Sequence, residues 1–167
     1  MMQEKDDLYF MKKAISRAKA AGKVGEVPIG AVLVKDGKII SSGRNMREAS
    51  ANALHHAELI AIDRGCKKLG AWRLEDCTLY VTMEPCPMCA GAIINSRIKR
   101  VVFGCYDAKA GVYGSVLDLQ QYRFNHYYEV TGGVLEAECA KLLSDFFAGL
   151  RVRKSEEKKA RKEAENL

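Results

Sequence analysis

Two apolar segments separated by a short helical segment constrain the fold of this chain most strongly. The segments "CTLYVTM" (77–83) and "KRVVFGC" (99–105) have the composition of strands. Between them, "PMCAGAIINS" (87–96) begins with a proline, which suits the first turn of a helix. Because a helix joins them over so short a distance, the two strands should be parallel neighbours connected by a right-handed crossover. The sequence therefore predicts an α/β fold.

Other segments add a hairpin, three helices and a last strand. Residues 29–34 and 38–43 flank an Asp-Gly pair, which favours the tight turn of a β-hairpin. Helices are predicted at 5–20, at 56–69 and from Leu135 onward, and "HYYEV" (126–130) predicts a strand. The first helix should bury the face formed by Leu8, Met11, Ala14, Ile15 and Ala18. We expect one domain over 1–150, a mixed sheet with helices on both faces, followed by a charged helical extension at 151–167.

Composition favours a soluble globular protein, since 48% of the 167 residues are hydrophobic and 29% are charged. The longest apolar runs are too short to span a membrane. The N-terminus is acidic and lacks the basic-then-apolar order of a signal peptide, so a cytoplasmic location is the default expectation. In that reducing compartment the six cysteines should be thiols or metal ligands. Only Cys86 and Cys89 have ligand spacing, and the others are expected to be small core side chains: Cys66, Cys77, Cys105 and Cys139.

The chain has a formal net charge of +6. Residues 151–167 contain seven Lys/Arg and four Asp/Glu, so this segment supplies +3 of the total (7 − 4). Such a charge suits a polyanionic partner, for example a nucleic acid. Many basic proteins bind no nucleic acid, so charge alone leaves both interpretations open.

A Cys-x-x-Cys pair at a helix start (86–89) follows a His-His-Ala-Glu segment (55–58). A helix N-terminus favours the thiolate form, which binds metals, and one histidine with two cysteines suits Zn²⁺. Structural zinc has four protein ligands, whereas catalytic zinc keeps one position for water, whose protons Glu58 could manage. A structural site completed by His55 or His126, or a thiol–disulfide redox pair, remains an alternative.

His-Ala-Glu (56–58) followed by Pro-Cys-x-x-Cys (85–89) resembles the signature of the zinc-dependent nucleoside and nucleobase deaminases. The resemblance extends over nearly the whole chain to the bacterial tRNA-specific adenosine deaminases. It includes "EVPIGAVLV" (26–34), "TLYVTMEPCPMCAGAIINSRIKRVVFG" (78–104), "DAKAG" (107–111), "GS" (114–115), "FNH" (124–126) and "LLSDFF" (142–147). One segment departs: "NALH" (52–55) stands where the family usually has Asp-Pro-Thr-Ala.

The resemblance implies a three-layer, cytidine-deaminase-like fold with a mixed five-stranded sheet. It implies one Zn²⁺ per subunit, bound by His56, Cys86 and Cys89, with His55 in the place of a small residue. The implied reaction is the hydrolytic deamination of adenosine to inosine at the wobble position of a tRNA anticodon. In that reaction zinc activates the water that attacks C6 of adenine, and Glu58 carries protons to the ring and then to the leaving amine.

The resemblance also implies substrate contacts. Asn45 matches an asparagine that hydrogen-bonds the flipped base, with a turn residue as the alternative. The backbone near Val27, Ala57 and Glu84 should line the pocket. Asp107 should lie near the preceding nucleotide, with a loop cap as the alternative.

The remaining expectations concern the RNA and the partners. Phe146 and Phe147 could stack on loop bases or pack in the core. His126 is expected to be structural or adjacent to the substrate. The family's usual partners are the anticodon stem-loop of an arginine tRNA and a second copy of the chain. A small-molecule deaminase for free cytosine, guanine or a nucleotide, and a non-catalytic zinc module that binds RNA, are the alternative functions.

Overall fold

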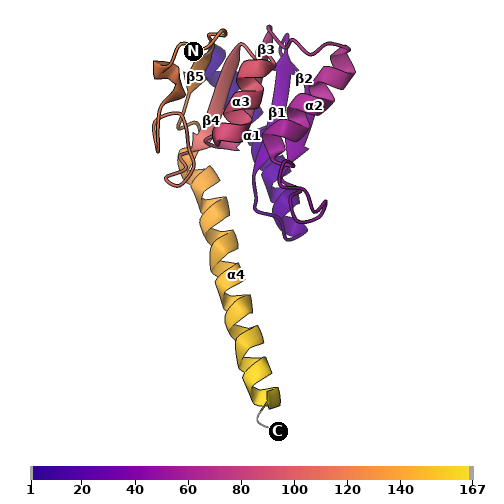
Figure 1. Cartoon of the computed structure of the whole chain (residues 1–167), viewed down its shortest axis with the longest axis vertical. Coiled ribbons are helices and arrows are strands. Elements are labelled where there is room, and N and C mark those ends of the chain that lie inside the picture. Colours follow the sequence, from indigo (N-terminus) through magenta and orange to yellow (C-terminus); the bar gives the residue numbers. More distant parts are fainter. Residues whose placement is uncertain (1, 166–167) are drawn as a thin grey trace.

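The computed structural model describes residues 2–165 and contains one five-stranded sheet with the strand order β2-β1-β3-β4-β5 (Figure 1). This confirms the predicted mixed sheet. The strands are β1 (Gly30–Lys35), β2 (Lys38–Arg44), β3 (Cys77–Met83), β4 (Arg100–Cys105) and β5 (Glu129–Thr131). The helices are α1 (Met2–Lys23), α2 (Ala57–Leu69), α3 (Pro87–Asn95), α4 (Glu136–Glu165) and a short 3-10 turn, η1 (Leu119–Gln121).

The predicted hairpin is formed by β1 and β2, which pair antiparallel from Gly30↔Arg44 to Lys35↔Lys38. At its tip Asp36 and Gly37 have φ values of 49° and 69°. These positive angles at both central residues are those of the tight hairpin turn that an Asp-Gly pair favours.

The predicted β3-α3-β4 unit is also present. Strands β3 and β4 are parallel, with Thr78 paired to Arg100 and Val81 paired to Phe103. Strand β5 extends the sheet parallel to β4, but it begins only at Glu129, three residues later than predicted. Residues just before the strand make a different contact: Nε2 of His126 lies 2.7 Å from the Ile98 carbonyl oxygen. This contact holds His126 outside the strand.

Helices cover both faces of the sheet, as predicted. One apolar core lies between the sheet and helices α2 and α3, and a second lies between the sheet and helices α1 and α4. Figure 1 shows α2 and α3 on the near side of the strands, with α1 behind them. Gly43 permits the close approach of α2 to β2, because a Cβ atom there would collide with the Ala57 carbonyl oxygen.

The buried face of α1 differs from the prediction at one position. Leu8 is 38% exposed, whereas the neighbouring Asp7 and Phe10 are buried. The face is rotated because the carboxylate of Asp7 accepts two hydrogen bonds from Arg100 under the sheet, at 2.7 and 2.8 Å. Of the cysteines expected in the core, Cys77, Cys105 and Cys139 are buried, while Cys66 is only half-buried beside the Trp72 carbonyl.

Helix α4 leaves the body of the protein and continues alone (Figure 1). Cys139 is its only buried residue among those described, and every residue from 151 to 165 is exposed. This helix therefore begins by packing on β4 and ends as a solvated arm. Within residues 2–165, no helix has both the length and the apolar character needed to cross a membrane.

Candidate active site

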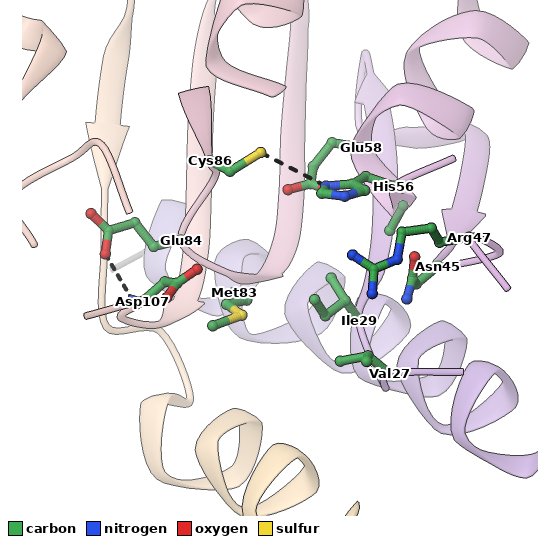
Figure 2. Close-up of a pocket in the computed structure, with 11 residues that line it drawn as sticks. Val27, Ile29, Asn45, Arg47, His56, Glu58, Met83, Glu84, Cys86 and Asp107 are labelled. Carbon is green, nitrogen blue, oxygen red and sulfur yellow. Dashed lines mark hydrogen bonds between the residues drawn. The ribbon is translucent and has the colours of Figure 1, made fainter. Parts of the chain in front are cut away.

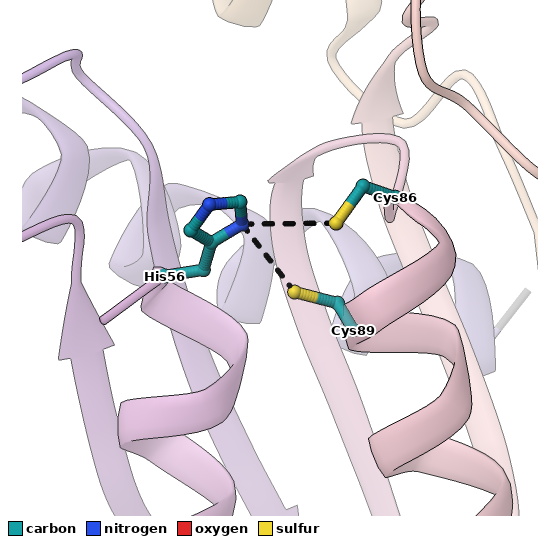
Figure 3. Close-up of side chains that lie close together, drawn as sticks. All are labelled: His56, Cys86 and Cys89. Atoms are coloured by element: carbon teal, nitrogen blue, oxygen red, sulfur yellow. Dashed lines mark hydrogen bonds between the residues drawn. The ribbon is translucent and has the colours of Figure 1, made fainter. Parts of the chain in front are cut away.

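Three potential metal ligands meet where helices α2 and α3 begin. His56 is the residue immediately before α2, Cys86 immediately precedes α3, and Cys89 lies in the first turn of α3. Nδ1 of His56 lies 3.7 Å from Sγ of Cys86 and 3.6 Å from Sγ of Cys89, as Figure 3 shows. Strands β2 and β3 run in the same direction, because each is antiparallel to β1, so the helices that follow them begin at the same edge of the sheet. Residues 30 and 33 positions apart in the sequence therefore meet at one point.

The arrangement of these three atoms fits a tetrahedral metal ion. Zinc bonds of about 2.3 Å to sulfur and 2.0–2.1 Å to nitrogen, at tetrahedral angles, separate nitrogen from sulfur by about 3.6 Å. The two observed separations agree with this value. Both helix N-termini point their backbone N–H groups toward the site, which favours anionic ligands there. The His/Cys/Cys group can therefore hold a metal ion without rearrangement.

The two thiols have different acidities. A hydrogen bond from Cys89 and a further one from His56 lower the pKa of Cys86 to about 4, so its thiolate forms readily. The same contact, together with burial, raises the pKa of Cys89, whose side chain is fully buried. Because the thiolate is the form that binds a metal, Cys86 is prepared as a ligand before any metal arrives.

No fourth ligand completes the group within residues 2–165. His126 is held by the Ile98 carbonyl and stacks on the Tyr128 ring with centroids 5.6 Å apart, so it is structural. A three-ligand group leaves one tetrahedral position for water, which is the arrangement of catalytic rather than structural zinc.

His55 serves its own loop instead of the metal group. Nδ2 of Asn52 donates to Nε2 of His55 over 3.1 Å, so the ring proton lies on Nδ1. Nδ1 lies 2.6 Å from Oγ of Ser50 and donates to it, and that hydroxyl donates to the Met46 carbonyl. The atypical segment 52–55 therefore builds a closed hydrogen-bonded loop that leads directly into His56.

Glu58 lies in the first turn of α2, and its carboxyl lies beside the His56 ring at the pocket, as Figure 2 shows. Its side chain is almost completely buried, and burial raises the pKa of this carboxyl to about 7. A carboxyl group with a pKa near neutrality can both accept and donate a proton at physiological pH. Glu58 is thus suited to proton transfer in the pocket that it lines.

A small pocket of about 130 Å³ opens beside the His/Cys/Cys group (Figure 2). Ligand pockets for drug-sized molecules are typically 300–1,000 Å³, so this pocket suits a single ring system. Its lining residues are Val27, Ile29, Asn45, Arg47, His56, Ala57, Glu58, Met83, Glu84, Cys86 and Asp107. The structure thus brings together five of the six residues expected to contact substrate.

Phe146 is the expected contact that does not line this pocket. It lies half-buried on α4, with its ring 5.5 Å from that of Phe147 in an edge-to-face arrangement. Its stacking on a loop base stays a prediction.

Sequence reasoning missed three pocket residues, Ile29, Arg47 and Met83. Each is one or two residues from a predicted contact, and Ile29 and Met83 also lie in segments that carry the resemblance to the deaminases.

Glu84 and Asp107 shape one wall of the pocket. The Glu84 carboxylate accepts hydrogen bonds from the backbone N–H groups of Asp107 and Tyr113, at 2.9 and 2.8 Å, and from the Ser115 hydroxyl. Asp107 in turn caps its own turn, accepting from the N–H groups of Lys109 and Ala110. Because these carboxylates are engaged with the loop, their main role in the free protein is to fix the wall's shape.

The chain is similar to known proteins over most of its length. A family model described as MafB19-like deaminase matches residues 5–151. A tRNA-specific adenosine deaminase of Bacillus subtilis (strain 168) is 55% identical over 155 residues, which cover 92% of this chain and 96% of that relative. A solved structure from studies of A-to-I editing by tRNA deaminases at the wobble position of transfer RNA is 42% identical. It has a TM-score of 0.77 and the match covers 81% of this chain and 99% of that chain.

A guanine deaminase from Nitrosomonas europaea is also similar, at 25% identity and a TM-score of 0.70 over 84% of each chain. The fold and the site therefore define an enzyme of the deaminase class, with a cytidine-deaminase-like architecture. Within that class, the chain belongs to the family of bacterial tRNA-specific adenosine deaminases.

Proposed function

We propose that this enzyme converts adenosine to inosine at the wobble position of a tRNA anticodon. The observation that carries the proposal is the placement of a three-ligand His/Cys/Cys group and a buried carboxyl, Glu58, on one small pocket. The similarity to tRNA-specific adenosine deaminases over nearly the whole chain supports the choice of substrate. The reaction consumes water and releases ammonia.

The metal that this donor set fits is Zn²⁺, one per chain, held by His56, Cys86 and Cys89. When bound, zinc supplies Lewis acidity and lowers the pKa of a coordinated water to roughly 7. All remaining steps belong to the side chains of the pocket.

Glu58 is the proposed catalytic residue. With its pKa raised to about 7 by burial, it accepts a proton from water and delivers it to N1 of adenine, which makes C6 electrophilic. It then helps to protonate the leaving amine, so one carboxyl serves as base and as acid. Asn45 binds the edge of the base, while the backbone at Val27, Ala57 and Glu84 confines it in the pocket.

The RNA would reach beyond the pocket to α4. A flipped base fills a pocket of this size, whereas the rest of the anticodon loop must lie outside it. Residues 151–165 form an exposed helical arm with seven basic and four acidic side chains. Phosphate contacts by these side chains would release counterions, so binding of the RNA should weaken as salt rises. We therefore assign 1–150 to the deaminase domain and 151–167 to an extension that contacts RNA.

A homodimer completes the proposal. Beside the metal group, a groove is lined by four apolar and four polar or charged side chains. Of the apolar ones, Leu54 is 57% exposed, and Leu59 and Ile60 are half-buried. An exposed apolar surface of this kind suits association with a second copy. Sedimentation of the purified protein tests this association. We expect wild type to be a dimer and Leu54→Glu to dissociate it.

Because tRNA is the substrate, we place the enzyme in the cytoplasm.

A small-molecule deaminase is the second candidate, because a guanine deaminase has a similar fold. The two candidates differ in what the chain offers outside the pocket. The charged arm of α4 would serve no purpose in binding a free base.

Incubation with a transcribed anticodon stem-loop tests the proposal, with inosine measured after digestion to nucleosides. Wild type should form inosine, and Glu58→Gln should lower turnover by ~10²–10⁴-fold or more, since glutamine cannot move the proton. Absence of inosine with zinc-loaded wild type, or turnover by Glu58→Gln within a few-fold of wild type, would contradict it.

A further inference from the structure

Glu26 is a buried acid close to the pocket that has no part in the chemistry proposed above. Only 1% of its surface is exposed, and it does not line the pocket. It follows α1, in the loop that leads to β1. A carboxylate buried this completely needs hydrogen-bond donors around it.

Two donors satisfy the two oxygens of Glu26. The backbone N–H of Ala49 donates to Oε1 over 2.6 Å, and Nδ2 of Asn45 donates to Oε2 over 3.4 Å. Both donors belong to the segment that runs from the end of β2 toward His56. Glu26 therefore fixes the position of that segment and, through it, one edge of the pocket.

The contact with Asn45 also decides which way its amide faces. A side-chain amide has a donor end and an acceptor end of nearly the same shape, so only its partners define the orientation. The Glu26 carboxylate accepts hydrogen bonds and cannot donate them when ionised. If the Asn45 amide turned over, Oδ1 would face a carboxylate oxygen inside the protein, which is unfavourable.

Asn45 is itself 93% buried and lines the pocket, so its remaining atoms face a bound base. With one N–H on Glu26, the amide offers Oδ1 as acceptor and its second N–H as donor. We propose that Glu26 is a positioning residue, which fixes the orientation of the Asn45 amide and thereby the order of donor and acceptor that the pocket presents to the base. This inference rests on the proposed function for the identity of that base.

Glu26→Gln provides the sharpest test, because it keeps the shape and changes one acceptor into a donor. The short contact with Ala49 requires an acceptor, so Oε1 of glutamine stays there and Nε2 faces Asn45. Asn45 must then turn its own Oδ1 toward Nε2, which exchanges donor and acceptor in the pocket. We expect kcat/KM on the stem-loop to fall roughly 10- to 100-fold, the size typical of one paired amide–base contact.

Glu26→Asp distinguishes an effect on the orientation of the Asn45 amide from an effect on the packing of the side chain at position 26. Aspartate is shorter and fills the site less well, but it keeps two acceptor oxygens and therefore the orientation of the amide. We expect Glu26→Asp to retain more activity than Glu26→Gln. A packing role for Glu26 predicts the opposite order, because glutamine is the closer match in shape. Glu75→Gln, which makes the same change at an exposed acid, is the matched control and should leave kcat/KM unchanged.

A double-mutant cycle with Asn45→Ala shows whether Glu26 acts through Asn45. In the Asn45→Ala background, Glu26→Gln should change kcat/KM by less than about threefold, because no amide remains to turn. An equal loss in both backgrounds would overturn the proposal. All variants should keep one metal ion per chain and a cooperative unfolding transition; loss of either in both Glu26 variants would make Glu26 structural and would also overturn it.

The same cycle is measured as the Kd of the stem-loop in a Glu58→Gln background, in which turnover is removed. This measurement separates the positioning role of Glu26 from the proposed function. It detects the effect of Glu26 on RNA binding even when wild type yields no inosine. Weaker binding with Glu26→Gln than with Glu26→Asp, and only in the presence of Asn45, is the expected result. Binding that is unaffected by Glu26→Gln would refute the positioning role.

Discussion

Asp7 and Arg100, 93 residues apart in the sequence, form a two-bonded ion pair beneath the sheet, with N···O distances of 2.7 and 2.8 Å. The hydroxyl of Tyr80 donates to the same carboxylate over 2.9 Å. This pair joins α1 to β4 and is almost completely buried. Replacing Asp7 would leave the buried Arg100 with only the exposed carboxylate of Glu129, which lies 3.9 Å from its Nε.

We therefore predict that Asp7→Asn lowers the free energy of unfolding by about 3–5 kcal/mol, the usual cost of breaking a buried pair from one side. Denaturant unfolding measures the change. The exposed pair between Lys141 and Asp145 is the control, because Asp145→Asn should cost less than about 1 kcal/mol. Equal costs at the two positions would show that burial does not determine the strength of the first pair.

The second prediction concerns the adjacent histidines. His56→Ala should abolish binding of zinc, because its Nδ1 is one of the three atoms that we propose as ligands. His55→Ala should retain one zinc per chain, because its two ring nitrogens are used by Ser50 and Asn52. Metal content after dialysis, measured by elemental analysis, distinguishes the two. Retention of zinc by His56→Ala together with its loss from His55→Ala would reverse the assignment.

The third prediction concerns metal removal. In metal-free protein at pH 6, Cys86 should react with a small alkylating reagent, since its pKa is lowered to about 4, largely by a hydrogen bond from Cys89. Its rate should change little between pH 6 and pH 8, whereas an ordinary thiol speeds up nearly tenfold per pH unit over this range. Mass spectrometry of the labelled peptide gives the rate, and Cys86→Ser is the control. Zinc should protect Cys86; a rate that rises steeply with pH would show that the thiolate is not preformed.

The fourth prediction follows from the burial of Glu58, which raises its pKa from 4.5 to about 7. A raised pKa means that the folded state binds the proton more tightly than the unfolded state. The resulting contribution to stability is present below pH 4.5 and is lost as pH rises through 7. For metal-free protein this loss is on the order of 3 kcal/mol. Glu58→Gln lacks the buried charge.

Metal-free Glu58→Gln should therefore be more stable than metal-free wild type at pH 8, and the difference should shrink toward pH 5. Urea unfolding at both pH values, in the presence of a chelator, measures this difference. A difference that is independent of pH would show that the carboxyl titrates at its ordinary pKa.

The fold was largely predictable because its signals are local. The Asp-Gly turn at 36–37, the proline at the start of α3 and the apolar strands each specify their element without help from distant residues. Two features depend on partners that no local pattern reveals. The buried face of α1 includes Asp7 because Arg100 lies opposite, and β5 starts late because His126 is bound to Ile98.

In the candidate site, too, some residues have a local sequence signal and others depend on distant partners. The spacing of the histidine and cysteine motifs indicated the metal group, since that chemistry requires those residue types. Arg47 was missed because it carries no motif and enters the pocket only through the path of its loop. Glu26 begins the segment 26–34 that carries the resemblance, but its role could not be predicted, since that role depends on the atoms of Ala49 and Asn45 that it meets in the folded protein.

The proposed function requires that the pocket acts on an adenosine presented by RNA. Its most direct test is the rate of deamination of an anticodon stem-loop compared with free adenosine, cytidine and guanine, at equal concentration and low salt. We predict inosine in the stem-loop at its wobble adenosine, little or no turnover of the free compounds, and a rate that declines as salt is raised. Turnover of a free base or nucleoside at a comparable rate, with no dependence on salt, would contradict the claim and identify a small-molecule deaminase.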